Sequence, residues 1–346
     1  MPYSPAASPQ AVEVRTPGRL HLGMFSFGNP AVPSFGGVGV MLDAFGIAVR
    51  LTRADRFAAV GPMAERAVQF ARQFAAAWQA DAACLIEVLE SPRPHVGLGS
   101  GTQLALAVAA GMRRLFVDEP SPGAGSFTVA EAFSLAAAVG RGRRSSVGIY
   151  GFAGGGLIAE KGRMAGDGGG PPSPLLARVE LPEAWRCVVL IRRDAAGLHG
   201  DAEKAAFARL PPVAGDLSSE LVRIACEELV PAARQGRFDA FSDAVGRYGK
   251  LAGRPFESES SRLPFHDAIG RLIAMLGELG VAGAAQSSWG PAVMACCPSS
   301  AAAEELVAEL TARGLAVDHD ITVARFNTRG ASLREIQAGT GCGRRP

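Results

Sequence analysis

The sequence predicts an α+β protein with two lobes, and three observations support this fold class. The chain has 346 residues, of which 48% are hydrophobic, and a single hydrophobic core rarely grows beyond roughly 250–300 residues. A glycine- and proline-rich run at 164–174 divides the chain into halves of similar length. Both halves contain segments with the two-residue period of strands and the 3.6-residue period of helices. We therefore expect an N-terminal domain at 11–165, a linker or exposed loop at 166–180 and a C-terminal domain at 181–335.

The N-terminal half reads as strands followed by helices. Alternating or β-rich patterns predict strands at 11–15, 38–42, 46–52 and 84–89. Helical periodicity predicts helices at 64–79, 102–116 and 128–139.

The order of elements in the C-terminal half is more specific. A compact apolar strand is predicted at 185–192, and helices follow at 201–210, 218–234, 238–251 and 264–279. Next come two short strands around a glycine turn, a helix and a last strand, at 281–285, 292–297, 301–312 and 315–326. This order, β–α–β–β–α–β with additional helices in the first crossover, predicts a ferredoxin-like split βαβ domain.

Charge and composition exclude several function classes. With 35 basic and 33 acidic residues the net charge is only +2, which argues against a nucleic-acid binder and against a membrane-surface binder. No run reaches ~18 apolar residues, so we expect no membrane span, and residues 1–10 lack the features of a signal peptide. The six cysteines form no C-x-x-C pair, and we expect a reducing, cytoplasmic compartment.

The strongest functional motif is a glycine-rich loop, PHVGLGSGTQ at 94–103, directly before a predicted helix. Alternate glycines let backbone N–H groups point into one concavity, and the helix adds its positive N-terminus. We expect phosphate to bind at Gly97, Leu98, Gly99, Ser100, Gly101, Thr102 and Gln103. The alternative is a tight turn that packs the helix on a sheet. The loop is neither a Walker A motif nor a G-x-G-x-x-G motif.

Three motifs together resemble the GHMP superfamily of small-molecule kinases. The loop is similar to that superfamily's P-x-x-x-G-L-G-S-S-A motif, Pro17-Gly18-Arg19 to its first motif, and the turn at 287–291 to its third. The resemblance covers nearly the whole chain. It implies a two-lobed GHMP-kinase-like fold, with a left-handed-crossover-type phosphate loop in an N-terminal α+β domain and a ferredoxin-like C-terminal domain.

The segment that carries the kinase aspartate differs in this chain. Kinases of the superfamily commonly have G-x-x-S-G-x-D there, whereas the matching stretch, GRRSSVGIYG, contains no carboxylate. This stretch and the residue before it carry a cluster of basic and hydroxyl residues instead: Arg141, Arg143, Arg144, Ser145 and Ser146. Guanidinium groups bind phosphate and carboxylate in a bidentate manner, so we expect phosphate binding here. The alternative is a solvated basic turn.

Four motifs in combination resemble the beta-ribofuranosylaminobenzene 5'-phosphate synthase family, a non-kinase branch. They are HVGLGSGTQLALAVA, Arg19-Leu20-His21, GGVGV at 36–40 and GLHGDAE at 197–203. The resemblance implies condensation of phosphoribosyl pyrophosphate with 4-aminobenzoate or 4-hydroxybenzoate, with release of carbon dioxide and pyrophosphate, in methanopterin-type cofactor biosynthesis. It also implies Mg²⁺ and a homodimer. An ATP-dependent GHMP kinase and a non-catalytic ligand-sensing protein are the alternatives.

This chemistry suggests catalytic roles for four residues: Arg19, His21, His199 and Glu203. Departure of pyrophosphate requires cations and N–H donors that stabilise its charge. Arg19 or an arginine near 143 is expected to hold the aromatic carboxylate. His21 shares a strand face with Arg19 and is expected to touch a phosphate or the para substituent, or else to be a structural edge histidine. His199 and Glu203 are expected to face the substrate or to cap their loop.

Two further places are candidates for ligand binding. Ser288, Trp289 and Gly290 are expected to bind substrate, with Trp289 supplying an aromatic face or serving as a packed hairpin residue. Asp43 is the magnesium candidate, and its alternative is a turn residue.

Overall fold

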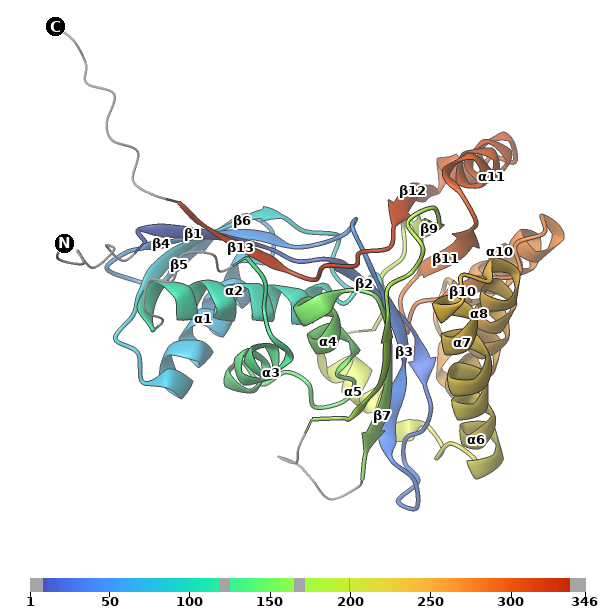
Figure 1. Ribbon diagram of the computed structural model, residues 1–346, viewed down its shortest axis with the longest axis horizontal. Coiled ribbons are helices and arrows are strands. Elements are labelled where there is room, and N and C mark those ends of the chain that lie inside the picture. The colour runs from blue at the N-terminus through green and yellow to red at the C-terminus, as the bar shows by residue number, and fades with distance from the viewer. Residues whose placement is uncertain (1–8, 118–124, 165–171, 199, 337–346) are drawn as a thin grey trace, which may run out of the picture.

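The structure, a computed structural model, describes residues 9–117, 125–164, 172–198 and 200–336. The first of its three sheets is five-stranded, with helices on one face (Figure 1). Its order is β13 (Ser332–Ile336), β1 (Ala11–Arg15), β4 (Ala48–Arg53), β6 (Cys84–Glu90) and β5 (Ala58–Val60). The covering helices are α1 (Ala64–Trp78), α2 (Ser100–Phe116) and α3 (Val129–Ala138). Leu51, Phe74 and Leu104 are buried in the core between the two layers.

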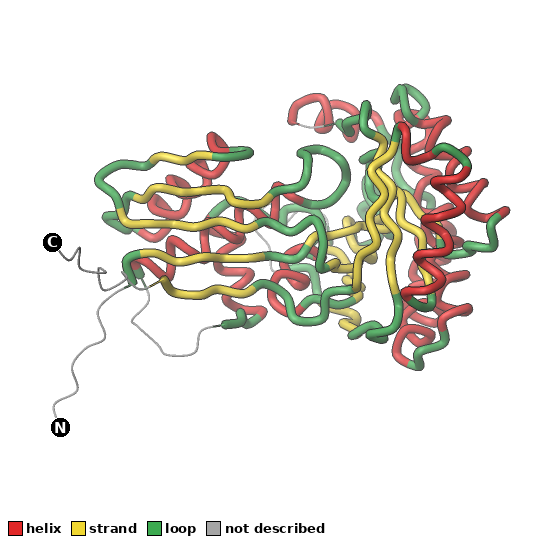
Figure 2. Tube along the Cα trace, turned by 90° about the horizontal axis from the view of Figure 1, so that it is seen from above, coloured by secondary structure: helices red, strands yellow, loops and turns green. Residues whose placement is uncertain are grey.

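The second sheet has four strands and crosses the middle of the molecule. Its order is β2 (Gly18–Met24), β3 (Ser34–Leu42), β7 (Leu157–Arg163) and β8 (Leu175–Val179). Helix α4 (Val147–Gly154) lies against this sheet on the side of α3 (Figure 1). Seen from above, the strands toward one end of the molecule run across the direction of the strands at the other end (Figure 2).

The third sheet has the order β10 (Ala284–Gln286), β11 (Ala292–Cys297), β9 (Arg186–Arg192) and β12 (His319–Arg325), with antiparallel neighbours. The helices between β9 and β10 include α5 (Gly200–Arg209), α6 (Gly215–Arg223), α7 (Val230–Arg234), α8 (Phe238–Gly253), α9 (Glu257–Ser260) and α10 (His266–Glu278), and α11 (Ser300–Ala312) connects β11 to β12. In chain order these strands are second, third, first and fourth, which is the ferredoxin-like arrangement. The predicted split βαβ plan is therefore confirmed.

Three predicted elements differ in detail. The strand predicted at 281–285 forms only at Ala284–Gln286. The helix predicted at 218–234 contains a π-helical turn at Ile224–Leu229 between α6 and α7. Pro231 follows that turn, and a proline lacks the N–H that an α-helical register requires. The strand predicted at 315–326 begins only at His319, because a 3₁₀ turn at Leu315–Val317 precedes it.

The predicted domain boundaries are wrong at two places. Leu175–Val179, expected in the linker, forms β8 and pairs with β7, because Ala177 and Val179 are buried against the middle sheet. Strand β13, expected in the C-terminal domain, pairs with β1 in the first sheet. One hydrophobic cluster joins Leu20 and Val38 of the middle sheet to Val189 and Phe241 of the C-terminal half. The two halves therefore share a core.

Within the described residues, no helix combines the length and apolar character needed to cross a membrane.

Candidate functional site

The glycine-rich loop has the backbone shape that its sequence predicts. His95, Gly97 and Gly99 have φ angles of 62°, 92° and 68°, a region that favours glycine. Helix α2 starts at Ser100, and its N-cap residue, Gly99, provides no side-chain cap. The N-terminus of a 17-residue helix thus lies at the end of the loop, and it carries partial positive charge.

The third-motif turn packs directly against this loop. A Cβ on Gly290 would lie 2.3 Å from the backbone N of Gly97, and a Cβ on Gly97 would lie 2.4 Å from the carbonyl oxygen of Ser287. The Ser287 hydroxyl donates to the Gly97 carbonyl over 2.7 Å. The backbone N–H of Gly197 donates to the His95 carbonyl over 2.7 Å. Segments separated by about a hundred residues and more are therefore in backbone contact at one place.

Arg19 lies along the glycine-rich loop. A Cβ on Gly99 would lie 2.7 Å from Nε of Arg19, so glycine is required for this approach. Nε of Arg19 is buried and has no hydrogen-bond partner among the described residues. Burial lowers the pKa of Arg19 to about 10, while the charges of Glu160 and Glu203 raise it. A half-buried guanidinium with an unpartnered Nε at this position suits an anionic ligand.

Arg66 of α1 is a residue that the sequence analysis did not identify. A Cβ on Gly101 would lie 2.7 Å from its Nη2 atom, so Arg66 reaches the first turn of α2. The guanidinium groups of Arg141 and Arg66 lie 4.8 Å and 5.9 Å from the ring centroid of Phe70. Burial, and then the charge of Arg66, lower the pKa of Arg141 to about 10. The spacing of Arg66 and Phe70, four residues on one helix, was the only available signal.

Two other predicted residues are brought together from different halves of the chain. Nη1 of Arg144 lies 2.8 Å from Oε1 of Glu203, and the guanidinium of Arg144 lies 4.4 Å from the ring centroid of Phe207. Arg143, in contrast, is exposed. His199 lies outside the described residues.

His21 is buried, and both of its ring nitrogens are engaged. Nδ1 accepts the backbone N–H of Gly23 over 3.2 Å, so Nε2 carries the proton and donates to Oγ of Ser145 over 3.1 Å. Burial, and then the charge of Arg19, lower the pKa of His21 to about 3. The ring therefore has the contacts of a neutral structural histidine, which is the alternative role considered for it. Its contact with substrate stays a prediction.

Glu160 is a buried carboxylate that the sequence analysis also missed. Its oxygens accept the backbone N–H of Ser146 over 2.7 Å and 2.9 Å, the N–H of Val147 over 3.3 Å and the Ser145 hydroxyl over 2.7 Å. Burial raises its pKa, and these hydrogen bonds oppose that shift. Glu160 and Lys161 interrupt the apolar pattern of β7, so this strand was not predicted. A carboxylate of a neighbouring strand thus holds the arginine-rich segment at the start of α4.

Trp289 is part of an aromatic cluster. Its ring centroid lies 6.1 Å from that of Phe207 and 5.2 Å from that of Phe256. Its indole N–H is buried without a partner among the described residues. The neighbouring Ser288 is exposed, and its backbone N–H donates to the carbonyl of His21 over 2.9 Å. The aromatic cluster is thus connected through this turn to the glycine loop.

The magnesium prediction for Asp43 is not supported by its contacts. Its two carboxylate oxygens accept the backbone N–H and Nε of Arg325, each over 2.9 Å. Asp43 lines a cavity of about 490 Å³ with Arg15 and Glu90, and no residue of the glycine loop lines that cavity. In the part of the chain that the structure describes, no group of three or more His, Cys, Asp or Glu side chains is placed to hold a metal. Magnesium binding stays a prediction.

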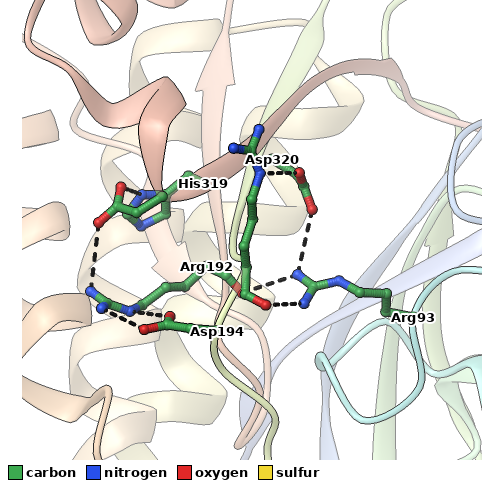
Figure 3. A network of polar contacts seen from close by, with 7 residues as sticks. Arg93, Arg192, Asp194, His319 and Asp320 are labelled. Carbon is green, nitrogen blue, oxygen red and sulfur yellow. Dashed lines mark hydrogen bonds and ion pairs between the residues drawn. The ribbon is translucent and has the colours of Figure 1, made fainter.

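Arg93 ties the entrance of the glycine loop to the third sheet (Figure 3). It donates to the carbonyl oxygens of Arg193 and Arg192 over 2.6 Å and 3.0 Å, and its guanidinium lies 3.5 Å from Asp320. Arg192 is held in turn by Asp194 over 2.6 Å. The loop is therefore positioned by both halves of the molecule.

Comparisons with known proteins agree with this architecture. Residues 229–315 match the family model described as "GHMP kinases C terminal". This match and the shared fold agree with the resemblance to the GHMP superfamily that the motifs indicate. The chain also resembles proteins named beta-ribofuranosylphenol 5'-phosphate synthase. The one from Methanothermobacter thermautotrophicus is 29% identical over 299 residues, 81% of this chain and 87% of the relative. The one from Archaeoglobus fulgidus is 28% identical over 260 residues, 72% of this chain and 78% of the relative.

Solved structures share the fold. A homoserine kinase from Cytophaga hutchinsonii superposes with a TM-score of 0.63 at 15% identity, covering 96% of this chain and all of that one (100%). A mevalonate diphosphate decarboxylase from Enterococcus faecalis gives 0.64 at 13% identity, covering 94% and 99%. At such low identity these likenesses establish the two-lobed architecture alone.

Proposed function

We propose that this chain condenses phosphoribosyl pyrophosphate with a 4-substituted benzoate. The products are a beta-ribofuranosyl-arene 5'-phosphate, carbon dioxide and pyrophosphate. One observation carries the proposal: Arg19 and Arg66 reach the start of α2, Arg141 lies with Arg66 beside Phe70, and the turn packed on the same loop carries Trp289. An anion-binding loop beside an aromatic cluster suits a phosphorylated sugar and an aromatic acid.

The residues of this chain can stabilise the leaving group and orient the acceptor. As the bond between the anomeric carbon and the pyrophosphate oxygen breaks, the guanidinium groups and the α2 terminus take up the developing negative charge. The ring carbon that bears the carboxylate then bonds to the anomeric carbon. The bond to the carboxylate breaks next, and its electron pair restores the aromatic ring as carbon dioxide leaves. No proton is removed, so this sequence of bonds requires no carboxylate base.

The names of the relatives support one choice of aromatic acid. Their printed names contain a phenol, which favours 4-hydroxybenzoate over 4-aminobenzoate as the substrate here. We propose that the reaction belongs to methanopterin-type cofactor biosynthesis. We also propose that Mg²⁺ accompanies the substrate diphosphate, because Mg²⁺ commonly binds through substrate phosphates. A homodimer and a cytoplasmic location are part of the same proposal.

An ATP-dependent kinase is the alternative, since its fold is shared by a homoserine kinase. Such kinases commonly use a carboxylate near the glycine loop. In this chain Glu160 is fully buried and accepts N–H groups of Ser146 and Val147, so it is not available to a substrate hydroxyl. This contact favours the synthase.

The test is an incubation of the full chain with phosphoribosyl pyrophosphate, Mg²⁺ and carboxyl-labelled 4-hydroxybenzoate. We expect equimolar labelled carbon dioxide and pyrophosphate, and less of both with 4-aminobenzoate. A parallel incubation with Mg²⁺, ATP and small alcohols, including homoserine, scores ADP. Formation of ADP without carbon dioxide would overturn the synthase in favour of the kinase.

A further inference from the structure

We propose that Glu203 competes with the substrate carboxylate for Arg144, and that Arg144 on Phe207 is the binding place for the aromatic acid. The identity of that acid rests on the proposed function. The ligand class itself, a planar aromatic monocarboxylate, is inferred from the contacts of these three residues.

Glu203 satisfies only part of the hydrogen-bonding capacity of the Arg144 guanidinium. Glu203 contacts it through a single pair of atoms, Nη1 and Oε1, over 2.8 Å. No other hydrogen-bond partner of the Arg144 guanidinium is present among the residues that the structure describes. A guanidinium presents a planar fork of N–H groups that a carboxylate can bind in a bidentate manner. Glu203 uses only part of that fork.

The ion pair is weak enough to be exchanged. The side chains of Arg144 and Glu203 are 35% and 39% exposed, and ion pairs at this level of exposure contribute little to stability because water screens them. A ligand carboxylate that replaces Glu203 therefore loses little by opening the pair. It gains the second hydrogen bond of the bidentate contact.

The aromatic surroundings favour a ring on the ligand. The guanidinium of Arg144 lies 4.4 Å from the centroid of Phe207, whose ring also neighbours Phe27, Phe35 and Trp289 at 5.0 Å, 6.1 Å and 6.1 Å. A benzoate held by its carboxylate on Arg144 has aromatic surfaces within its reach. An aliphatic acid gains less at the same place.

This place is coupled to the sugar-phosphate loop. The hydroxyl of Ser145, next to Arg144, is hydrogen-bonded to Nε2 of His21. The carbonyl of His21 accepts the backbone N–H of Ser288. The charge of Glu203 also acts on Arg19, where it raises the pKa. Glu203 is thus near both arginines, and release of its carboxylate from Arg144 changes the charge beside the loop.

The experiment is a calorimetric titration of the full chain with 4-hydroxybenzoate and its neutral analogue 4-hydroxybenzamide, with and without magnesium pyrophosphate. The variants are Glu203→Gln, Glu203→Ala and Arg144→Gln. The matched control is Glu309→Gln, which breaks a pair with Arg313 of similar length, 2.7 Å, and similar exposure, 47% and 41%, on α11. Thermal unfolding establishes that each variant is folded.

We expect both Glu203 variants to tighten benzoate binding about fivefold, the factor that corresponds to ~1 kcal/mol, and to leave benzamide binding unchanged. Arg144→Gln weakens benzoate binding about tenfold, and Glu309→Gln has no effect. Unchanged or weaker benzoate binding in folded Glu203 variants overturns the inference, as does equal tightening of the amide. These titrations need no turnover. A positive titration without carbon dioxide release therefore refutes the proposed reaction alone, and turnover with a negative titration refutes the inference alone.

Discussion

The hydroxyl of Ser145 donates to Oε1 of Glu160 over 2.7 Å, and this contact joins the arginine-rich segment to the middle sheet. Through the same hydroxyl, His21 of β2 is joined to Glu160 of β7. The start of α4 is thereby fixed relative to the strand that carries Arg19. The candidate site rests on this buried polar network, and its individual contacts lead to separate predictions.

Glu160→Ala is expected to lower the free energy of unfolding by about 3 kcal/mol, because it leaves buried N–H donors unsatisfied. Glu160→Gln retains one acceptor and is expected to cost less. Urea denaturation measures both values. Glu180→Ala is the control: it removes an exposed partner of Arg178 and should change stability by less than about 0.5 kcal/mol. An equally small loss in the free energy of unfolding for Glu160→Ala would contradict a stabilising role for the buried polar network.

His21 makes stability depend on pH. Its pKa is about 3 in the folded protein, against an ordinary value of 6.5. Below pH 6.5 the unfolded chain binds a proton that the folded chain does not, so stability present above pH 6.5 is lost as the pH falls toward 3. The slope is ~1.4 kcal/mol per pH unit. Between pH 5.5 and 4, His21→Gln should reduce the slope of the free energy of unfolding against pH by about this amount. Equal slopes for both proteins would refute the assignment.

Gly99→Ala is expected to weaken pyrophosphate binding about tenfold or more, because the new Cβ would meet Nε of Arg19 and φ is 68°. Titration calorimetry with pyrophosphate provides the measurement. Gly277→Ala on α10, where a Cβ meets nothing within 4 Å, should leave binding unchanged and stabilise the protein by about 0.5–1 kcal/mol. Equal effects of both substitutions would exclude a specific role for the loop.

Arg66→Gln is expected to raise KM for phosphoribosyl pyrophosphate about tenfold, the loss of one charge-assisted hydrogen bond. The exposed Arg72 of the same helix provides the control, since Arg72→Gln removes the same charge away from Gly101. Steady-state kinetics at fixed 4-hydroxybenzoate separates the two. Similar KM values for both variants would mean that Arg66 acts only through net charge.

Arg93→Gln is expected to raise KM for phosphoribosyl pyrophosphate about threefold, because the loop entrance loses its hydrogen bonds to the carbonyls of Arg192 and Arg193. Arg193→Gln removes a side chain that pairs with Asp320 but leaves those carbonyls in place. It should therefore have no effect on KM. A larger effect from Arg193→Gln than from Arg93→Gln would contradict the anchoring role of Arg93.

Some elements of the site were predictable because their signals are local. The glycine loop at 94–103 specifies a backbone shape within ten residues, and the positive φ angles at Gly97 and Gly99 agree with it. The ferredoxin-like plan follows from the order of strands and helices, which hydrophobic periodicity reveals. Short motifs were also enough to indicate the superfamily.

Other elements depended on which segments pack together, and sequence periodicity carries no such information. Arg66 reaches Gly101 only because α1 and α2 lie side by side on the first sheet. Glu160 accepts a hydrogen bond from Ser145 only because α4 packs against β7. Strand β13 completes the first sheet from the far end of the chain.

By itself, the sequence determined the two-lobed fold class, the split βαβ order and the backbone shape of the glycine loop, since each depends on the conformation of neighbouring residues. Only the tertiary structure decided that Arg144 meets Glu203, that His21 is buried and neutral, and that both halves share one core. These outcomes depend on the packing of sheets and helices against one another, and residues far apart in the sequence become partners only when that packing forms.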